Sequence, residues 1–194
     1  MAEGSPDPAT RLLARASRGD VAASSLLASL LFAELRAVAD GYLKRERRGH
    51  TLQPTALIHE AWLRLDLGCE SGFESRRHFL RSAARAMRQV LVDHARARAA
   101  EKRAGAGPAQ PIELADALEV AGPHPLDVLA LDEALAELRA RDPELAELVD
   151  LRFFGGLTNA EAADVLGLSE RRGEHAWRTA RAFLRRELER GERA

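Results

Sequence analysis

Apolar residues recur at helical spacing in the first half of the chain. The pattern predicts a short helix from about Pro8 to Ser17, and a long one over residues 19–47 whose leucines recur three and four positions apart. Residues 51–65, TLQPTALIHEAWLRL, are predicted to be a third, amphipathic helix. A fourth is predicted over residues 75–103, with an apolar stripe of Phe79, Ala83, Ala86, Met87, Val90 and Leu91.

The sequence pattern of the second half predicts four further helices. Residues 125–140 place Val128, Leu131, Leu135 and Leu138 on one face. In the next segment, residues 141–154, Asp142 is a typical N-cap because Pro143 follows at the first helical position. Aromatic residues make up only 5% of the chain, which disfavours strands. The predicted fold class is therefore all-α.

Residues 157–188 have the pattern of a helix-turn-helix. Thr158 and Glu161 have the spacing of a capping box, Gly167 permits a tight turn, and Ser169 can cap the helix that follows. Ala163 is small where the two helices would cross. An ordinary αα-hairpin could carry the same signals, so the spacing alone leaves DNA binding open.

A segment rich in proline and glycine separates the two halves. Four of the eight prolines lie between residues 101 and 125, and no helical period persists through that segment. We predict two small helical domains, residues 8–101 and 125–190, joined by a flexible linker, residues 102–124.

Charge is strongly segregated although the net charge is only −1. Residues 42–103 hold 14 Lys and Arg against 7 Asp and Glu, and residues 171–194 hold 8 against 4. Residues 104–170 between them hold 3 against 14. Two basic blocks fit two contacts with a polyanion, while the alternative is a set of solvated helix faces.

Several classes of protein are disfavoured. The first ten residues do not resemble a signal peptide, and no apolar run approaches a membrane span, so we expect a cytoplasmic protein without membrane contact. Cys69 is the single cysteine, the histidines show no metal spacing with it, and no phosphate loop or nucleophile–base pattern occurs. We expect no enzyme activity, no cofactor and no metal.

Several motifs in register resemble one known family. They are ALIHEAWLRL, AARAMRQVLVDHARARAAEKR, LDEALAEL, DLRFFGGLTNAEAADVLGLS and AWRTARAFLRREL, spread from about Arg11 to Leu188. Together they resemble the bacterial extracytoplasmic-function (ECF) sigma factors of RNA polymerase. The chain is most similar to the subgroup with a neutral second region of the form QPTAL-HEA-LRL.

The resemblance implies a partner for each predicted domain. The first would be sigma region 2, which contacts the polymerase clamp and the minus-ten element, and the second would be region 4, which contacts the minus-thirty-five element. Core RNA polymerase and promoter DNA are the implied partners of a chain that is monomeric when free. The implied DNA-binding residues are Arg81, Arg85, Arg88, Gln89, Asp93, Arg96, Arg171, Arg172, His175 and Arg178. The implied polymerase-binding residues are Gln53, Thr55, Ala56, His59, Glu60 and Arg64.

Two departures from the family pattern leave rival functions open. Gln89 replaces the usual Asn, and Gly173, Glu174 and His175 replace the usual Val-Lys-Arg of the recognition helix. Glu174 would repel phosphates, and a glycine inside a helix costs about 1 kcal/mol relative to alanine. The alternatives are a helix-turn-helix regulator that binds DNA alone, and a degenerate sigma-like protein that only occupies a partner.

A third departure concerns regulation. Most relatives carry an acidic run at positions 53–56 that pairs with the polymerase clamp, and this chain carries Gln-Pro-Thr-Ala. A phosphate at the start of a helix would restore negative charge. The hypothesis is therefore activation by a Ser/Thr kinase at Thr55, or secondarily at Thr51. An anti-sigma factor is the alternative regulator.

Overall fold

The computed structural model describes residues 54–68, 73, 75–103 and 128–191, with scattered positions between 11 and 26. Every regular element among them is helical: α3 (Pro54–Gly68), α4 (Arg76–Arg103), α6 (Val128–Arg141), α7 (Pro143–Val149), η1 (Asp150–Phe154), α8 (Asn159–Leu166) and α9 (Glu170–Gly191). The predicted all-α class is thus confirmed for this part of the chain. Of the helices predicted over 8–17 and 19–47 only those scattered positions are described, and most of the predicted linker lies outside the described residues. Helix α4 continues to Arg103, two residues into that linker.

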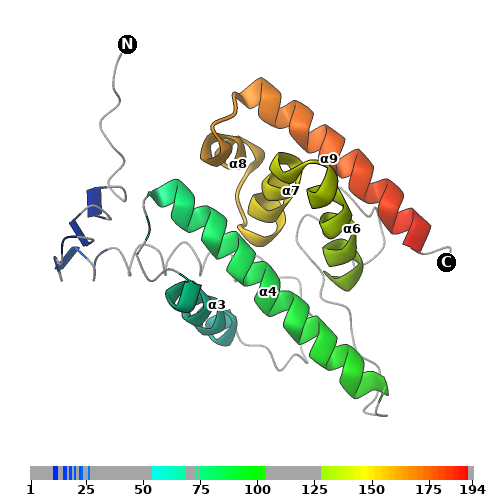
Figure 1. The fold of residues 1–194 in the computed structure, drawn as a ribbon, viewed down its shortest axis with the longest axis horizontal. Coiled ribbons are helices and arrows are strands. Elements are labelled where there is room, and N and C mark those ends of the chain that lie inside the picture. The colour runs from blue at the N-terminus through cyan, green and yellow to red at the C-terminus, as the bar shows by residue number, and fades with distance from the viewer. Residues whose placement is uncertain are drawn as a thin grey trace.

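Helix α4 is the central element of the fold. It lies between α3 on one side and the helices α6 to α9 on the other (Figure 1). The predicted stripe from Phe79 to Leu91 is buried, and so are Leu80, Ala84 and Val92 outside that stripe. A helix covered on two sides must bury more than one stripe, which explains the additional apolar positions.

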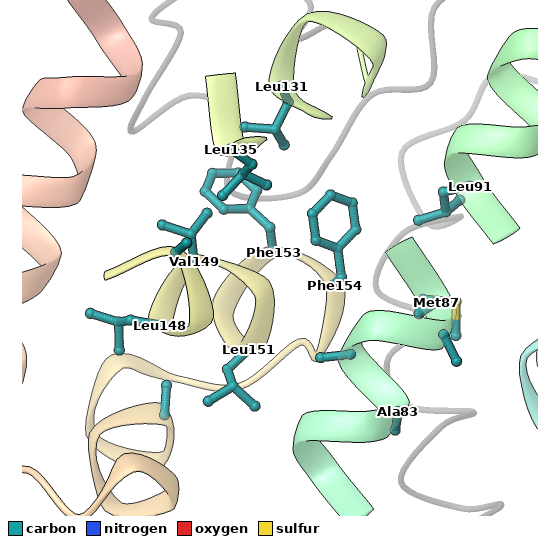
Figure 2. Packing of buried hydrophobic residues seen from close by; sticks show 14 of the residues in the cluster. Ala83, Met87, Leu91, Leu131, Leu135, Leu148, Val149, Leu151, Phe153 and Phe154 are labelled. Carbon is teal, nitrogen blue, oxygen red and sulfur yellow. The ribbon is translucent and has the colours of Figure 1, made fainter. Parts of the chain in front are cut away.

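A single cluster of buried apolar residues joins the two halves of the chain. Ala83, Met87 and Leu91 of α4 lie beside η1, whose Phe154 has no exposed surface (Figure 2). Leu131 and Leu135 of α6 belong to the same cluster. Burying a side chain the size of Phe or Leu contributes about 1.5–3 kcal/mol each. Apolar packing is therefore a main cause of the contact between α4 and the second half.

The helix predicted over residues 141–154 begins as expected but changes its winding. The Asp142 side chain accepts a hydrogen bond from the Leu145 amide, and Pro143 follows at the start of the helix. From Asp150 the helix is a π-helix, closed by a bond from the Gly155 amide to the Asp150 carbonyl at 2.9 Å. Four of its five residues are buried. Asp150 and Phe154, at its two ends, are both buried, and π-helical turns of this kind often occur at functional sites.

The turn between α8 and α9 has the predicted local chemistry. The Thr158 hydroxyl accepts a hydrogen bond from the Glu161 amide, and the Glu161 carboxylate accepts one from the Thr158 amide, which completes a capping box. Gly167 ends α8 with φ of 71°, in the left-handed region that favours glycine. The Ser169 hydroxyl accepts a bond from the Arg172 amide at 3.4 Å. These caps hold α9 in a fixed direction relative to α8.

None of the helices in the described part of the chain is both long and apolar enough to cross a membrane.

Candidate nucleic-acid and polymerase interfaces

Two arginines of α4 contact a carboxylate of α7. Arg81 donates to Glu147 from Nε to Oε1 at 2.7 Å and from Nη2 to Oε2, and Arg85 donates from Nη2 to Oε1 at 2.8 Å. The Glu147 side chain is only 12% exposed, whereas those of Arg81 and Arg85 are 43% and 58% exposed. The Glu147 carboxylate raises the pKa of Arg81 above its ordinary value. Two predicted DNA-binding residues therefore face an acidic partner within the chain.

A second group of ion pairs lies deeper, around Asp150. Its carboxylate is 3.5 Å from Arg88 of α4 and 2.5 Å from Arg139 of α6. Burial raises the pKa of the Asp150 carboxyl, and the Arg88 and Arg139 guanidinium groups lower it in part. Arg88 and Arg96 of α4 also lie 3.8 Å and 3.4 Å from Asp132 of α6. All four predicted DNA-binding cations of α4 thus pair with carboxylates of the second half.

The deeper pairs are incompletely hydrogen-bonded. Among the described residues, Arg88 Nε and Asp150 Oδ1 are buried without a hydrogen-bond partner. An unsatisfied buried polar atom costs about 1–3 kcal/mol. The polar part of this contact is consequently less favourable than its number of ion pairs would indicate.

Helices α3 and α4 are joined by two further side-chain pairs, each between an acidic and a basic residue. The Glu60 carboxylate lies 3.0 Å from His94 Nε2, and Arg64 donates to Asp93 at 2.8 Å. Each pair joins a predicted polymerase-binding residue of α3 to α4, and Asp93 is itself a predicted DNA-binding residue. Both pairs are partly exposed, so they join the two helices at the edge of their apolar contact.

The other predicted residues of these two helices are more accessible. Ala56 and His59 are exposed on α3, and Gln89 is exposed on α4. Thr55 is the second residue of α3, although its side chain is not described. Gln53 and Thr51 lie outside the described residues.

The predicted recognition surface lies at the start of α9. Arg171, Arg172, His175 and Arg178 are all exposed, and Glu174 is exposed among them. In the part of the chain described here, none of the three arginines is paired with a carboxylate. The first turns of α9 therefore carry accessible cations, in contrast to the paired cations of α4.

Gly173 lies on the opposite, buried face of α9. A Cβ at this position would come within 2.5 Å of the Ala163 side chain of α8. The glycine therefore permits close approach of two helices. This gives a packing reason for a residue that, from the sequence, indicated a weakened recognition helix.

The acidic partners of the α4 cations were not identified from the sequence. Asp132, Glu147 and Asp150 all lie in the acidic block of residues 104–170. The segregation of charge was the available signal, because a basic and an acidic block of one chain can pair with each other.

Comparison with protein-family models decides the family. A model described as "ECF sigma factor" matches residues 7–190, nearly the whole chain. The chain belongs to the ECF sigma factor family. No curated protein and no solved structure matches it.

Membership gives these surfaces their general role. ECF sigma factors are alternative sigma factors that direct transcription, and they bind core RNA polymerase and promoter DNA. The family is a class of non-enzymatic transcription regulators. The exposed cations of α9 and the paired cations of α4 are the candidate DNA contacts of this ECF sigma factor.

Proposed function

We propose that this ECF sigma factor binds core RNA polymerase through α3 and contacts promoter DNA through α4 and α9. In this assignment α4 contacts the minus-ten element and α9 contacts the minus-thirty-five element. The observation that carries the proposal is the family match over residues 7–190. The exposed cations at the start of α9 support it, because residues at the start of a recognition helix contact base edges.

The residues of α9 would divide their roles. Arg171 and Arg172, in the first turn, are our candidates for base edges, since arginine binds guanine through two hydrogen bonds. Arg178 and His175, one to two turns further on, would contact the backbone and position the helix. Glu174 stands among them and weakens the contact by repelling phosphates.

The residues of α4 would act on the opened strand. Gln89 is exposed and can donate and accept hydrogen bonds at a base edge. Arg96 would contact the backbone beside it, and Asp93, held by Arg64, would line the same surface. Arg81, Arg85 and Arg88 would neutralise phosphates along the helix.

We also propose that this sigma factor is activated by phosphorylation of Thr55, with Thr51 as the second candidate. Thr55 lies in the first turn of α3, where the free amide groups and the helix dipole favour an anion. The first turn of α3 contains no acidic residue. A phosphate would add about −1.5 to −2 charge there and could bind an arginine cluster on the polymerase.

Gel filtration with core RNA polymerase tests the assignment against a helix-turn-helix regulator that acts alone. Our proposal predicts a monomer that comigrates with the polymerase, for the phosphorylated form at least. A stable dimer that binds duplex DNA and never comigrates with the polymerase in either form would refute it, since lone helix-turn-helix regulators usually bind as symmetric dimers.

The degenerate sigma-like protein is the second candidate function. Glu174 favours it, because an exposed carboxylate stands among the cations that would face DNA. Gly173 no longer supports it, since that residue has a packing role against Ala163. Such a protein would bind the polymerase but would start no transcript of its own.

A further inference from the structure

One arginine of the π-helix contacts two other parts of the second half. The guanidinium carbon of Arg152 lies 4.5 Å from the centre of the Trp177 ring of α9. Arg152 Nη1 also donates a hydrogen bond to the Leu157 carbonyl at 3.4 Å. Leu157 directly precedes Thr158, the residue that caps α8. A single side chain therefore connects η1, the start of α8 and α9.

Trp177 lies on the opposite side of α9 from the proposed DNA contact. Its side chain is 7% exposed, whereas His175 and Arg178 close to it in the chain are exposed. Arg172 and Arg171 lie five and six residues earlier, which is about 7.5–9 Å along the helix axis. Because a helix of this length moves as a unit, a shift of the indole ring would move these cations with it.

We propose that Arg152 is a positioning residue for promoter recognition, which sets the orientation of α9 through the Trp177 ring. The proposal rests on the assignment of α9 to DNA contact, and it names a residue on which the specificity of that contact depends. Arg152 itself makes no contact with DNA. Groups that bind a partner must be held within roughly 0.5 Å and 10–20° of their productive geometry, so the orientation of α9 limits how well base edges are distinguished.

The chemistry of arginine suits this role. The face of an indole ring attracts a cation, and tryptophan is the best aromatic partner for such a contact. A planar guanidinium can stack on the ring and donate a hydrogen bond in its own plane at the same time, whereas a lysine ammonium cannot stack. Phe153, the next residue of the π-helix, lies beside the same indole, with the two ring centres 5.9 Å apart. Two consecutive residues of η1 therefore hold the Trp177 ring.

A second arginine provides a matched control. The guanidinium carbon of Arg141 lies 5.0 Å from the centre of the Phe183 ring, which is six residues after Trp177 in α9. Arg186 lies over the same Phe183 ring at 5.2 Å, so loss of Arg141 leaves that ring with a cation. Arg141→Leu therefore removes the same charge and the same kind of contact as Arg152→Leu, but farther from the start of α9.

Binding to DNA of selected and unselected sequence tests the proposal. The parent chain, alone or bound to core RNA polymerase, first selects duplexes from a pool with a randomised segment. The affinities of the parent chain, Arg152→Leu and Arg141→Leu are then measured for the selected duplex and for the unselected pool, over a series of salt concentrations. Melting curves show beforehand that each variant is folded at the temperature used.

We expect Arg152→Leu to lower the ratio of the two affinities by about 5-fold, within the range of a lost cation–π contact. Arg141→Leu should leave this ratio unchanged. The affinity of the free chain for the unselected pool, and its salt slope, should be the same for both variants, because non-specific binding depends on the exposed cations.

Three outcomes would contradict these expectations in different ways. Equal ratios for the two variants would refute the positioning role alone. A salt slope about one unit lower for Arg152→Leu than for Arg141→Leu would indicate that Arg152 contacts a phosphate directly, and it would overturn the proposal. A parent chain that selects no sequence in either form would refute DNA recognition by α9, and with it the proposed function on which the positioning role rests.

The fluorescence of Trp177 tests the same role in a milder variant, in case Arg152→Leu does not fold. The chain has two tryptophans, so Trp62→Phe leaves Trp177 as the only one. In this background Arg152→Lys keeps the charge but loses the planar stack. We expect stronger quenching of Trp177 by acrylamide and a lower ratio of the two DNA affinities than in the Trp62→Phe chain. An unchanged ratio would show that the contact is only structural, and unchanged quenching would show that Arg152 does not act through Trp177. Either result would overturn the proposal.

Discussion

Gly173 of α9 lies directly against Ala163 of α8, where a methyl group at position 173 would come within 2.5 Å of the alanine side chain. The two helices cross at this point, and the carboxyl end of α8 and the start of α9 are held by Gly167 and Ser169 on either side of the turn. The exposed cations of α9 are therefore oriented by a contact on its buried face.

Gly173→Ala should destabilise the protein although alanine is the better helix former. Alanine contributes about 1 kcal/mol of helix propensity, but overpacking a buried contact costs about 1–3 kcal/mol, and the Ala163 methyl group cannot rotate away. We expect a net loss of about 1 kcal/mol in the free energy of unfolding, measured by urea denaturation. The swapped variant Ala163→Gly/Gly173→Ala should be more stable than either single variant. A single Gly173→Ala variant as stable as the parent chain would contradict the packing role.

The capping box of α8 should make stability depend on pH in a defined direction. Two hydrogen bonds from Thr158 lower the pKa of the Glu161 carboxyl below its ordinary value of 4.5. The bond from the Thr158 hydroxyl has the larger effect, and the bond from the Thr158 amide has the smaller one. A carboxyl whose pKa is lowered by folding stabilises the folded state fully above pH 4.5. This stabilisation is lost as the pH falls through the carboxyl's lower pKa in the folded protein. Thr158→Ala should cost about 1 kcal/mol near neutral pH, and the difference should shrink below pH 4.5.

Thr179→Ala is the control for this experiment. Thr179 is an exposed threonine inside α9 whose hydroxyl donates to the His175 carbonyl, and it caps no helix. Its removal should cost little at any pH. Equal losses for Thr158→Ala and Thr179→Ala across the pH range would count against the capping box.

Glu174→Lys should tighten DNA binding if α9 faces the duplex. The change replaces a repelled carboxylate with a cation between Arg171 and Arg178, so the lysine can neutralise one more phosphate and the salt dependence steepens by about one unit. Glu189→Lys, an exposed position at the far end of the same helix, gives the same change of net charge. Equal effects of the two substitutions on affinity and salt slope would argue that the start of α9 does not contact DNA.

Phosphorylation of Thr55 should strengthen polymerase binding. Each charge-assisted hydrogen bond from the phosphate contributes about 1.5–3 kcal/mol, so we expect at least a 10-fold gain in affinity, since a factor of 10 corresponds to about 1.4 kcal/mol. The unmodified protein, the kinase-treated protein, Thr55→Ala and Thr55→Glu should be compared by fluorescence titration with core polymerase. Kinase treatment should have no effect on Thr55→Ala. Equal affinity of the unmodified and phosphorylated proteins would show that the neutral sequence at positions 53–56 has another cause.

The sequence predicted the helices where local chemistry determines them. The spacing of Leu131, Leu135 and Leu138 identified the buried face of α6, and all three are buried. Asp142 and Thr158 cap α7 and α8 as their positions predicted. These features depend on residues within a few positions of one another, which periodicity and capping rules describe well.

Contacts between the two halves were not predictable in the same way. The pairing of Arg81 with Glu147 joins residues 66 positions apart, and no local pattern reports which face of a helix meets which partner. The burial of Leu80 and Ala84 has the same cause, since it depends on α4 being covered from two sides. The π-helical turn at Asp150 accompanies this packing and has no helical-period signal of its own.

Transcription by reconstituted holoenzyme tests the central claim most directly. Core polymerase, with and without the protein, is supplied with genomic DNA fragments, and the 5′ ends of the transcripts are mapped. The protein should be supplied both unmodified and after kinase treatment. Our account predicts new start sites that require the protein and share sequence elements near minus ten and minus thirty-five. A protein that binds the polymerase in either form but adds no start sites would contradict a promoter-directing role and leave only that of a partner-binding sigma-like protein.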